Sequence, residues 1–124
     1  MNGAGAAFGR RLFAIALAAF FLRLAVRLVT GVGDYWTNGY THYQQLAASL
    51  VAGHGYAFPG EAPTAFRVPL YPMFIAAVTW GNTNPWVLVV AQSIVSSALA
   101  VIAGLTARRL FNPAAGLAAA ALCA

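Results

Sequence analysis

This sequence has very few acidic residues and no lysine. The 124-residue chain has two acids, Asp34 and Glu61, against seven basic residues that are all arginine, and only 7% of its residues are charged. Soluble domains carry roughly 25% charged residues. A chain that is 61% hydrophobic, with a mean hydropathy of +0.74, is therefore not built to face water. Because no hydrophilic stretch is long enough to fold separately, the sequence predicts a single membrane domain over 1–124.

Cysteine occurs once, at Cys123 in an alanine-rich run, which excludes an internal disulfide. His42 and His54 are twelve residues apart, and no third ligand stands at a suitable spacing, so we predict no metal site. The sequence also lacks a nucleotide-binding glycine loop, and we expect its glycines to serve as helix caps and turns.

The seven arginines do not form one patch, which argues against nucleic acid as a partner. Most of them lie at the borders of apolar runs, as topology signals do: Arg10-Arg11, Arg23, Arg27, Arg67 and Arg108-Arg109. Arg23 and Arg27 share one helix face because they are four residues apart. Charges within a membrane helix face headgroups, water or protein. The pair therefore either snorkels to the headgroups, or binds an anionic phosphate or an acid of the following loop.

Two apolar runs, 12–31 and 85–107, are long enough to cross a bilayer. A helix of about 20 residues covers a hydrocarbon core of about 30 Å. A cleaved signal peptide is the rival interpretation of the first run, but Arg23 and Arg27 interrupt it and no clear cleavage site follows. A third run, 114–124, covers about half a membrane. We therefore expect the sequence to be the amino-terminal part of a larger multi-span protein.

The arginines also predict the orientation. If the chain crosses twice, Arg10-Arg11 and Arg108-Arg109 lie on one side, which the positive-inside rule makes cytoplasmic. The apolar segment 69–80 is too short to span and is predicted to be an interfacial or re-entrant helix. With the amino terminus in the cytoplasm, the segment 32–84 is predicted to be an external loop, periplasmic or extracellular, of a multi-pass protein of the cell inner (plasma) membrane.

The external loop is predicted to contain a second short helix, over 40–52, that lies along the membrane. Apolar residues recur there at helical spacing, while polar residues take the other side and Gly53 and Gly55 end the helix. The apolar stripe is Tyr43, Leu46, Ala47, Leu50 and Val51, and the polar residues are Thr41, Gln44, Gln45 and Ser49. Arg67 precedes the helix over 69–80, whose free N–H groups favour an anion, so Arg67 binds either a phosphate or lipid headgroups.

Several short elements, in this order, are similar to the start of a known family. They are the external acid, Tyr43-Gln-Gln-Leu-Ala47, Leu50-Val-Ala-Gly-His-Gly-Tyr56, Ala65-Phe-Arg-Val-Pro-Leu-Tyr-Pro72 and Ala107-Arg-Arg-Leu-Phe111. The chain resembles, from about Leu12 onward, the GT-C membrane glycosyltransferases. The nearest group would be the bacterial protein O-mannosyltransferases and aminoarabinose transferases.

The resemblance implies an all-α integral membrane fold, here a truncated GT-C-like fold. It would have two transmembrane helices, two membrane-parallel helices in the first external loop and the start of a third transmembrane helix. Such enzymes transfer a sugar from a polyprenyl-phosphate donor to a lipid, glycan or protein acceptor on the outer face. A divalent metal is variable in the family, so no certain cofactor is implied. Membrane lipids and the lipid-linked donor are the implied partners.

The resemblance also implies roles for individual residues. An acid of the first external loop is the supposed general base, which makes Asp34 the catalytic candidate. Arg67 would contact the donor phosphate or the substrate. Tyr43 and His54 match the family pattern, and Glu61 is the reserve acid. The family places its acid four residues before the tyrosine that matches Tyr43, where this chain has Gly39, so Asp34 stands five residues earlier than expected.

We expect the 124-residue chain alone to be inactive, because about two and a half membrane helices cannot enclose donor and acceptor. The main alternative is a small non-catalytic membrane subunit or scaffold whose external loop binds a partner. A transport function is a weaker alternative. It would rest on Arg23, Arg27 and the serine-bearing face of the second span, since nothing else polar recurs through both spans.

Overall fold

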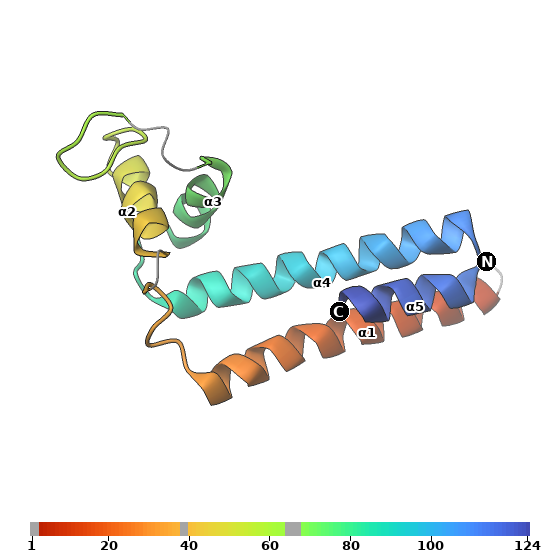
Figure 1. Cartoon of the computed structure of the whole chain (residues 1–124). Helices are drawn as coiled ribbons and strands as arrows, with labels where there is room; N and C mark the ends of the chain where they lie inside the picture. The colour runs from red at the N-terminus through yellow and green to blue at the C-terminus, as the bar shows by residue number, and fades with distance from the viewer. Residues whose placement is uncertain (1–2, 38–39, 64–67) are drawn as a thin grey trace. The chain divides into compact units, whose positions relative to one another are not determined.

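The computed structural model describes residues 3–37, 40–63 and 68–124, and over these ranges the chain is helical without strands (Figure 1). The helices are α1 (Gly3–Thr30), α2 (Tyr40–Val51), α3 (Leu70–Thr79), α4 (Pro85–Leu110) and α5 (Pro113–Cys123). Two of them contain apolar stretches long enough to cross a membrane, Gly5–Thr30 and Pro85–Leu110. The all-α prediction is confirmed for the described residues, and the two long helices are compatible with a membrane protein.

The chain divides into two compact units. The long-helix unit comprises Met1–Thr30 with Gln92–Ala124, and the short-helix unit comprises Gly31–Ala91. Helix α4 belongs to both, since its first seven residues lie in the short-helix unit and the remainder in the long-helix unit. The prediction that residues 1–124 form one membrane domain stays a prediction.

All five helices predicted from the sequence are present, and their observed bounds differ from the predicted ones mainly at the two long helices. Helix α1 begins at Gly3 rather than at residue 12, because alanine and arginine are strong helix formers and continue the helix backwards from the apolar run. Helix α4 extends through Arg108-Arg109 to Leu110 for the same reason. The three short helices lie within two residues of their predicted bounds at each end.

Within the long-helix unit, α4 runs antiparallel to α1. The register is fixed by two contacts: the Arg108 guanidinium carbon lies 4.3 Å from the centre of the Phe8 ring, and Gly104 lies against Leu12. Phe8, Leu12 and Ala120 form the buried cluster that joins α1 to α5. The start of α1 therefore lies beside the end of α4, as Figure 1 shows.

Two glycines allow α4 and α5 to approach closely. A Cβ atom at Gly116 would stand 2.7 Å from the Gly104 carbonyl oxygen and 2.9 Å from the Arg108 Cβ, closer than real Cβ atoms come. A Cβ atom at Gly104 would stand 2.7 Å from the Leu12 Cδ1 and 3.0 Å from the Gly116 carbonyl oxygen. Small residues at such crossings are typical of helices packed in membranes.

In the short-helix unit, α2 and α3 pack against each other and against the first turns of α4. Ala47, Ile75 and Leu88, one from each helix, are at most 3% exposed and form the centre of the core. Aromatic rings surround this centre: Tyr35, Trp36, Tyr43, Tyr71 and Phe74. Helix α3 ends at Trp80, which adopts the left-handed conformation (φ 48°) and donates its backbone N–H to the Ala76 carbonyl.

The face predicted for α2 needs one correction. Leu46 and Ala47 are buried as predicted, but Ser49, assigned to the polar outer side, is only 6% exposed. The chain turns back after α2, and the His54 N–H donates to the Ser49 carbonyl at 3.0 Å. Val51, assigned to the apolar stripe, is 37% exposed. Ser49 lies three residues after Leu46 and therefore on the same side of the helix, and the prediction placed it outside because serine is polar.

Candidate functional site

The catalytic candidate Asp34 lies in a hydrogen-bonded turn between α1 and α2. Its carbonyl oxygen accepts the Thr37 backbone N–H at 3.1 Å and the Thr37 hydroxyl at 2.6 Å. At the start of the turn, the Tyr35 backbone N–H donates to the Val32 carbonyl at 3.1 Å. Because these bonds use the backbone of Asp34, its carboxylate remains exposed at the surface of the short-helix unit. We call residues 32–37 the Asp34 turn.

A row of aromatic rings connects the Asp34 turn to both short helices. The ring centres are 6.1 Å apart for Tyr35 and Tyr40, 6.3 Å for Tyr40 and Tyr43, and 5.1 Å for Tyr43 and Tyr71. Tyr71 in turn stacks on Phe74 at 6.4 Å. Aromatic pairs at these separations stabilise beyond the area that they bury. The row therefore holds the turn against α2 and α3.

Tyr43, a predicted substrate contact, lies within this row. It is half-buried, its ring meets the Tyr71 ring edge to face at an interplanar angle of 79°, and it packs on the core of the short-helix unit. This environment gives Tyr43 a packing role. The aromatic row also links Tyr43 to the Asp34 turn through Tyr40 and Tyr35.

His54 and Glu61 lie apart from this row, on the turn-rich segment after α2. Both are exposed. The backbone N–H of Glu61 closes a turn to the Phe58 carbonyl at 3.0 Å, and an isolated bridge between Ala57 and Pro63 closes the loop. Gly53, Gly55 and Gly60 all have φ between 76° and 78°, where side chains with a Cβ are strained, so glycine shapes this segment.

Among the described residues, no hydrogen bond or ion pair joins Asp34 to His54 or Glu61. Arg67 and Gly39 lie outside the described residues, so the roles predicted for those two positions stay predictions. The described ranges also contain no group of three His, Cys, Asp or Glu side chains that could hold a metal ion.

Arg23 does not extend freely toward headgroups. It is partly buried, and its guanidinium donates to the Ala19 carbonyl at 3.2 Å and, at a longer 3.5 Å, to the Cys123 carbonyl of α5. Arg27, one turn later, is exposed. The two arginines predicted to share a role therefore differ in exposure, since Arg23 is partly buried and Arg27 is exposed.

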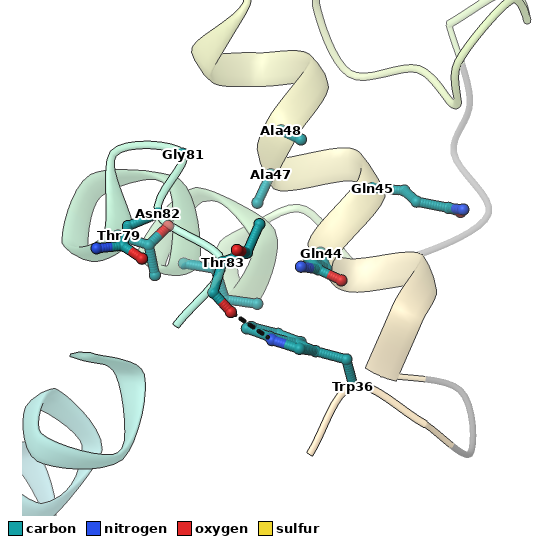
Figure 2. A pocket seen from close by; sticks show the side chains of 10 residues that line it. Trp36, Gln44, Gln45, Ala47, Ala48, Thr79, Gly81, Asn82 and Thr83 are labelled. Atoms are coloured by element: carbon teal, nitrogen blue, oxygen red, sulfur yellow. Dashed lines mark hydrogen bonds between the residues drawn. The ribbon is translucent and has the colours of Figure 1, made fainter. Parts of the chain in front are cut away.

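A pocket that the sequence did not indicate lies between α2 and the segment that leads from α3 to α4 (Figure 2). Its volume is about 130 Å³. The indole of Trp36 forms one wall and donates its Nε1–H to the Thr83 carbonyl at 3.0 Å, the dashed line in Figure 2. The other residues that line it are Gln44, Gln45, Ala47, Ala48, Ile75, Thr79, Gly81, Asn82 and Thr83.

The pocket combines an aromatic wall with amide and hydroxyl side chains. Periodicity placed Gln44 and Gln45 on the outer side of α2, and Gly81-Asn82 was interpreted only as a helix stop. The Asn82 side chain accepts the Asn84 N–H at 2.8 Å, and the Asn84 side chain accepts the Trp86 N–H at 3.0 Å, so this stretch also caps α4. Two adjacent glutamines and a Gly-Asn-Thr-Asn run were the signals that could have suggested a pocket here, although most of its exposed lining is apolar.

Comparison with known proteins adds no family. No protein-family model, no curated protein and no solved structure matches this chain.

Proposed function

We propose that this chain is the amino-terminal part of a GT-C-type membrane glycosyltransferase of a bacterial inner membrane. It would act with further spans of the same protein to transfer a sugar from a polyprenyl-phosphate donor to a lipid, glycan or protein acceptor. The short-helix unit would face the outer side and supply part of the acceptor site. By itself the chain would be inactive, because two long helices and α5 cannot enclose both substrates.

The observation that carries this proposal is the arrangement of the segment between the two long apolar helices. Helices α2 and α3 pack there into one compact unit, and the Asp34 turn is bound to them through the aromatic row. The resemblance leads us to expect two short helices at these positions, preceded by an exposed acid. The motif residues between Tyr43 and Pro72 supply the link to this family rather than to another membrane class.

The outer surface of α3 supports an interfacial position for this unit. Leu70, Met73 and Trp80 follow one face of the helix, and their side chains are 76%, 55% and 81% exposed. The opposite face, with Ile75 at 1% and Thr79 at 7% exposed, packs on the core. A helix whose exposed face is apolar and ends in tryptophan is suited to lie in the headgroup region of a bilayer.

In the proposed reaction the Asp34 carboxylate acts as general base. It accepts the proton of the acceptor hydroxyl as the acceptor oxygen forms a bond to C1 of the sugar. The bond between C1 and the phosphate oxygen breaks, and its electron pair leaves with the polyprenyl phosphate. A cation near the leaving group stabilises the added negative charge, and Arg67 is the candidate from sequence. The exposed carboxylate can reach an acceptor, since the Thr37 bonds involve only its backbone.

The test measures sugar transfer in membranes that contain the product of the complete gene. The donors offered are polyprenyl-phosphate mannose and polyprenyl-phosphate aminoarabinose, and release of polyprenyl phosphate is followed. General bases contribute about 10²–10⁴-fold, so Asp34→Asn should lower the rate by at least about 100-fold. Glu61→Gln, a matched change at the other acid, should leave it within a few-fold. An unchanged rate in Asp34→Asn would exclude Asp34 as the base, and turnover of neither donor would count against the transferase.

A second candidate function, partner binding by a non-catalytic subunit, is favoured by the same exposed face of α3. Leu70, Met73 and Trp80 could cover an apolar surface of another protein instead of lipid. This function predicts that Asp34→Asn leaves partner binding unchanged. Trp80→Ala should instead abolish copurification of a specific protein from the membrane.

A further inference from the structure

The long-helix unit carries nearly all of the positive charge of the protein and none of the negative charge. Six of the seven arginines lie in it, whereas both acids, Asp34 and Glu61, belong to the short-helix unit. Asp34 follows the far end of α1, about 30 Å along the helix from Arg10 at a rise of about 1.5 Å per residue. The long-helix unit itself therefore supplies no acidic counter-ion for these arginines.

Four of these arginines gather at one end of the unit. The Arg108 side chain crosses from α4 to the first turns of α1, where its guanidinium lies on the Phe8 ring at 4.3 Å from the ring centre. A Cβ atom at Gly5 would stand 3.9 Å from the Arg108 Nη2. Arg109 is the next residue on α4, and Arg10 and Arg11 lie within one turn of Phe8 on α1. We call Arg10, Arg11, Arg108 and Arg109 the arginine end.

Three members of the arginine end have exposed side chains: Arg10, Arg11 and Arg109. Only Arg108 is partly covered, by its contact with Phe8 and by α5, whose Gly116 lies against the Arg108 Cβ. Helix packing thus brings together two arginine pairs that are almost a hundred residues apart in the sequence, and it leaves most of their hydrogen-bond donors directed away from the unit.

The surface beside the arginine end is apolar. Phe13, two residues after Arg11, is 67% exposed, and Leu105 and Leu110 are 42% and 70% exposed on either side of Arg108-Arg109. Arginine bordering an exposed apolar surface is typical of the level where lipid headgroups meet acyl chains. An acidic soluble partner or a nucleic acid would match the charge but leave the adjacent apolar side chains in water.

We propose that the arginine end is a binding site for the phosphate of an anionic phospholipid headgroup, with the acyl chains on the adjacent apolar surface of α1 and α4. Arginine suits this ligand because its planar guanidinium can donate two parallel hydrogen bonds to phosphate oxygens. Basic clusters at the cytoplasmic ends of membrane helices bind such headgroups. The site is distinct from the proposed transfer site, and it rests on the proposed membrane location but not on sugar transfer.

The experiment uses the whole 124-residue chain in nanodiscs of phosphatidylcholine mixed with phosphatidylglycerol, and it measures retention of each lipid by native mass spectrometry. The wild type should retain phosphatidylglycerol in preference to phosphatidylcholine. Each surface arginine contributes roughly fivefold in affinity, so Arg10→Gln/Arg11→Gln/Arg109→Gln should reduce the preference by about 100-fold. Arg108 is left in place, because its replacement would also remove the Phe8 contact.

Two controls separate a site from general charge and from misfolding. The corresponding triple lysine variant keeps the charge but cannot donate the paired hydrogen bonds, so it should lose a large part of the preference, and full retention would mean that charge alone is recognised. Arg27→Gln removes one charge at the other end of α1 and should change the preference by less than twofold. The proposal is overturned if the glutamine triple variant keeps its preference with an unchanged helix content, or if Arg27→Gln alone has an effect of similar size.

The outcomes also separate this proposal from the proposed function. Failure of the wild-type chain to enter nanodiscs at all would contradict the membrane location on which both rest. Insertion without a preference for phosphatidylglycerol would overturn only the headgroup site. A preference for phosphatidylglycerol in a protein whose complete gene product transfers no sugar would support the headgroup site and count against the transferase alone.

Discussion

The two units of this protein differ in where their polar chemistry lies. The long-helix unit has six arginines, no acid, and buried contacts made through glycine, alanine and leucine. The short-helix unit holds both acids, both histidines, all five tyrosines and all three tryptophans. Its turns are closed by side-chain and backbone hydrogen bonds. One unit therefore combines an apolar surface with arginine side chains, and the other holds most of the aromatic and hydrogen-bonding side chains that could contact a polar surrounding.

The two units also differ in how their helices are packed together, although both contain apolar helices. In the long-helix unit close approach of backbones replaces large side chains at the crossing of α4 and α5. In the short-helix unit a few fully buried side chains, surrounded by aromatic rings, hold helices of only 10 and 12 residues together. Helices this short are marginal in isolation, so α2 and α3 depend on each other.

The largest effect is expected from the core of the short-helix unit. Ile75→Ala removes a side chain that is 1% exposed between α2, α3 and α4, and buried truncations of this type cost about 2–5 kcal/mol. We expect α2 and α3 to lose protection together in native-state hydrogen exchange while α1 and α5 keep theirs. Met73→Ala, on the exposed face of α3, should change stability by less than about 0.5 kcal/mol. Equal loss of protection in both units would show that they are not independent.

A smaller effect is expected at the glycine crossing of the long-helix unit. Gly116→Ala places a Cβ atom 2.7 Å from the Gly104 carbonyl oxygen, and such overpacking costs about 1–3 kcal/mol. Gly9→Ala is the matched control, because a Cβ there meets no atom within 4 Å. The control should stabilise α1 by about 0.5–1 kcal/mol through helix propensity. Chemical denaturation in detergent micelles measures both, and a stabilising Gly116→Ala would contradict the close crossing.

The smallest effect is expected at the indole hydrogen bond beside the pocket. Trp36→Phe removes the Nε1–H that donates to the Thr83 carbonyl, and a hydrogen bond of this kind contributes about 1 kcal/mol. Trp80→Phe, at a side chain that is 81% exposed, should leave the stability of the short-helix unit unchanged. Denaturation followed by far-UV circular dichroism compares the two, and equal midpoints would mean that this bond contributes nothing.

Sequence reasoning located the helices well because they follow strong local signals. Pro113 after Asn112 starts α5, and the Asn112 side chain accepts the Ala115 N–H at 2.9 Å, as expected for a helix cap. The helical spacing of Leu46 and Ala47 gave the buried side of α2. These features depend on residues a few positions apart, and the sequence shows such residues directly.

Features that depend on contacts between distant segments could not be predicted. Ser49 is buried in the folded unit although it is polar, and the bond from Trp36 to Thr83 joins residues 47 positions apart. Likewise, the sequence predicted Arg10-Arg11 and Arg108-Arg109 on the same side of the membrane, but not that helix packing brings them together. Their assembly into the arginine end requires the antiparallel register of α1 and α4, set by Phe8 and Arg108.

The central claim of this account is that two membrane-crossing helices carry the short-helix unit on the outer side and the arginine end on the inner side. It is tested by labelling single cysteines with a membrane-impermeant maleimide in intact bacterial cells, in a Cys123→Ser background. Glu61 and Phe111 are exposed sites in the two units. We predict that Glu61→Cys is labelled in intact cells and that Phe111→Cys is labelled only after the inner membrane is permeabilised. Labelling of both sites in intact cells, or the reverse order, would contradict the claim.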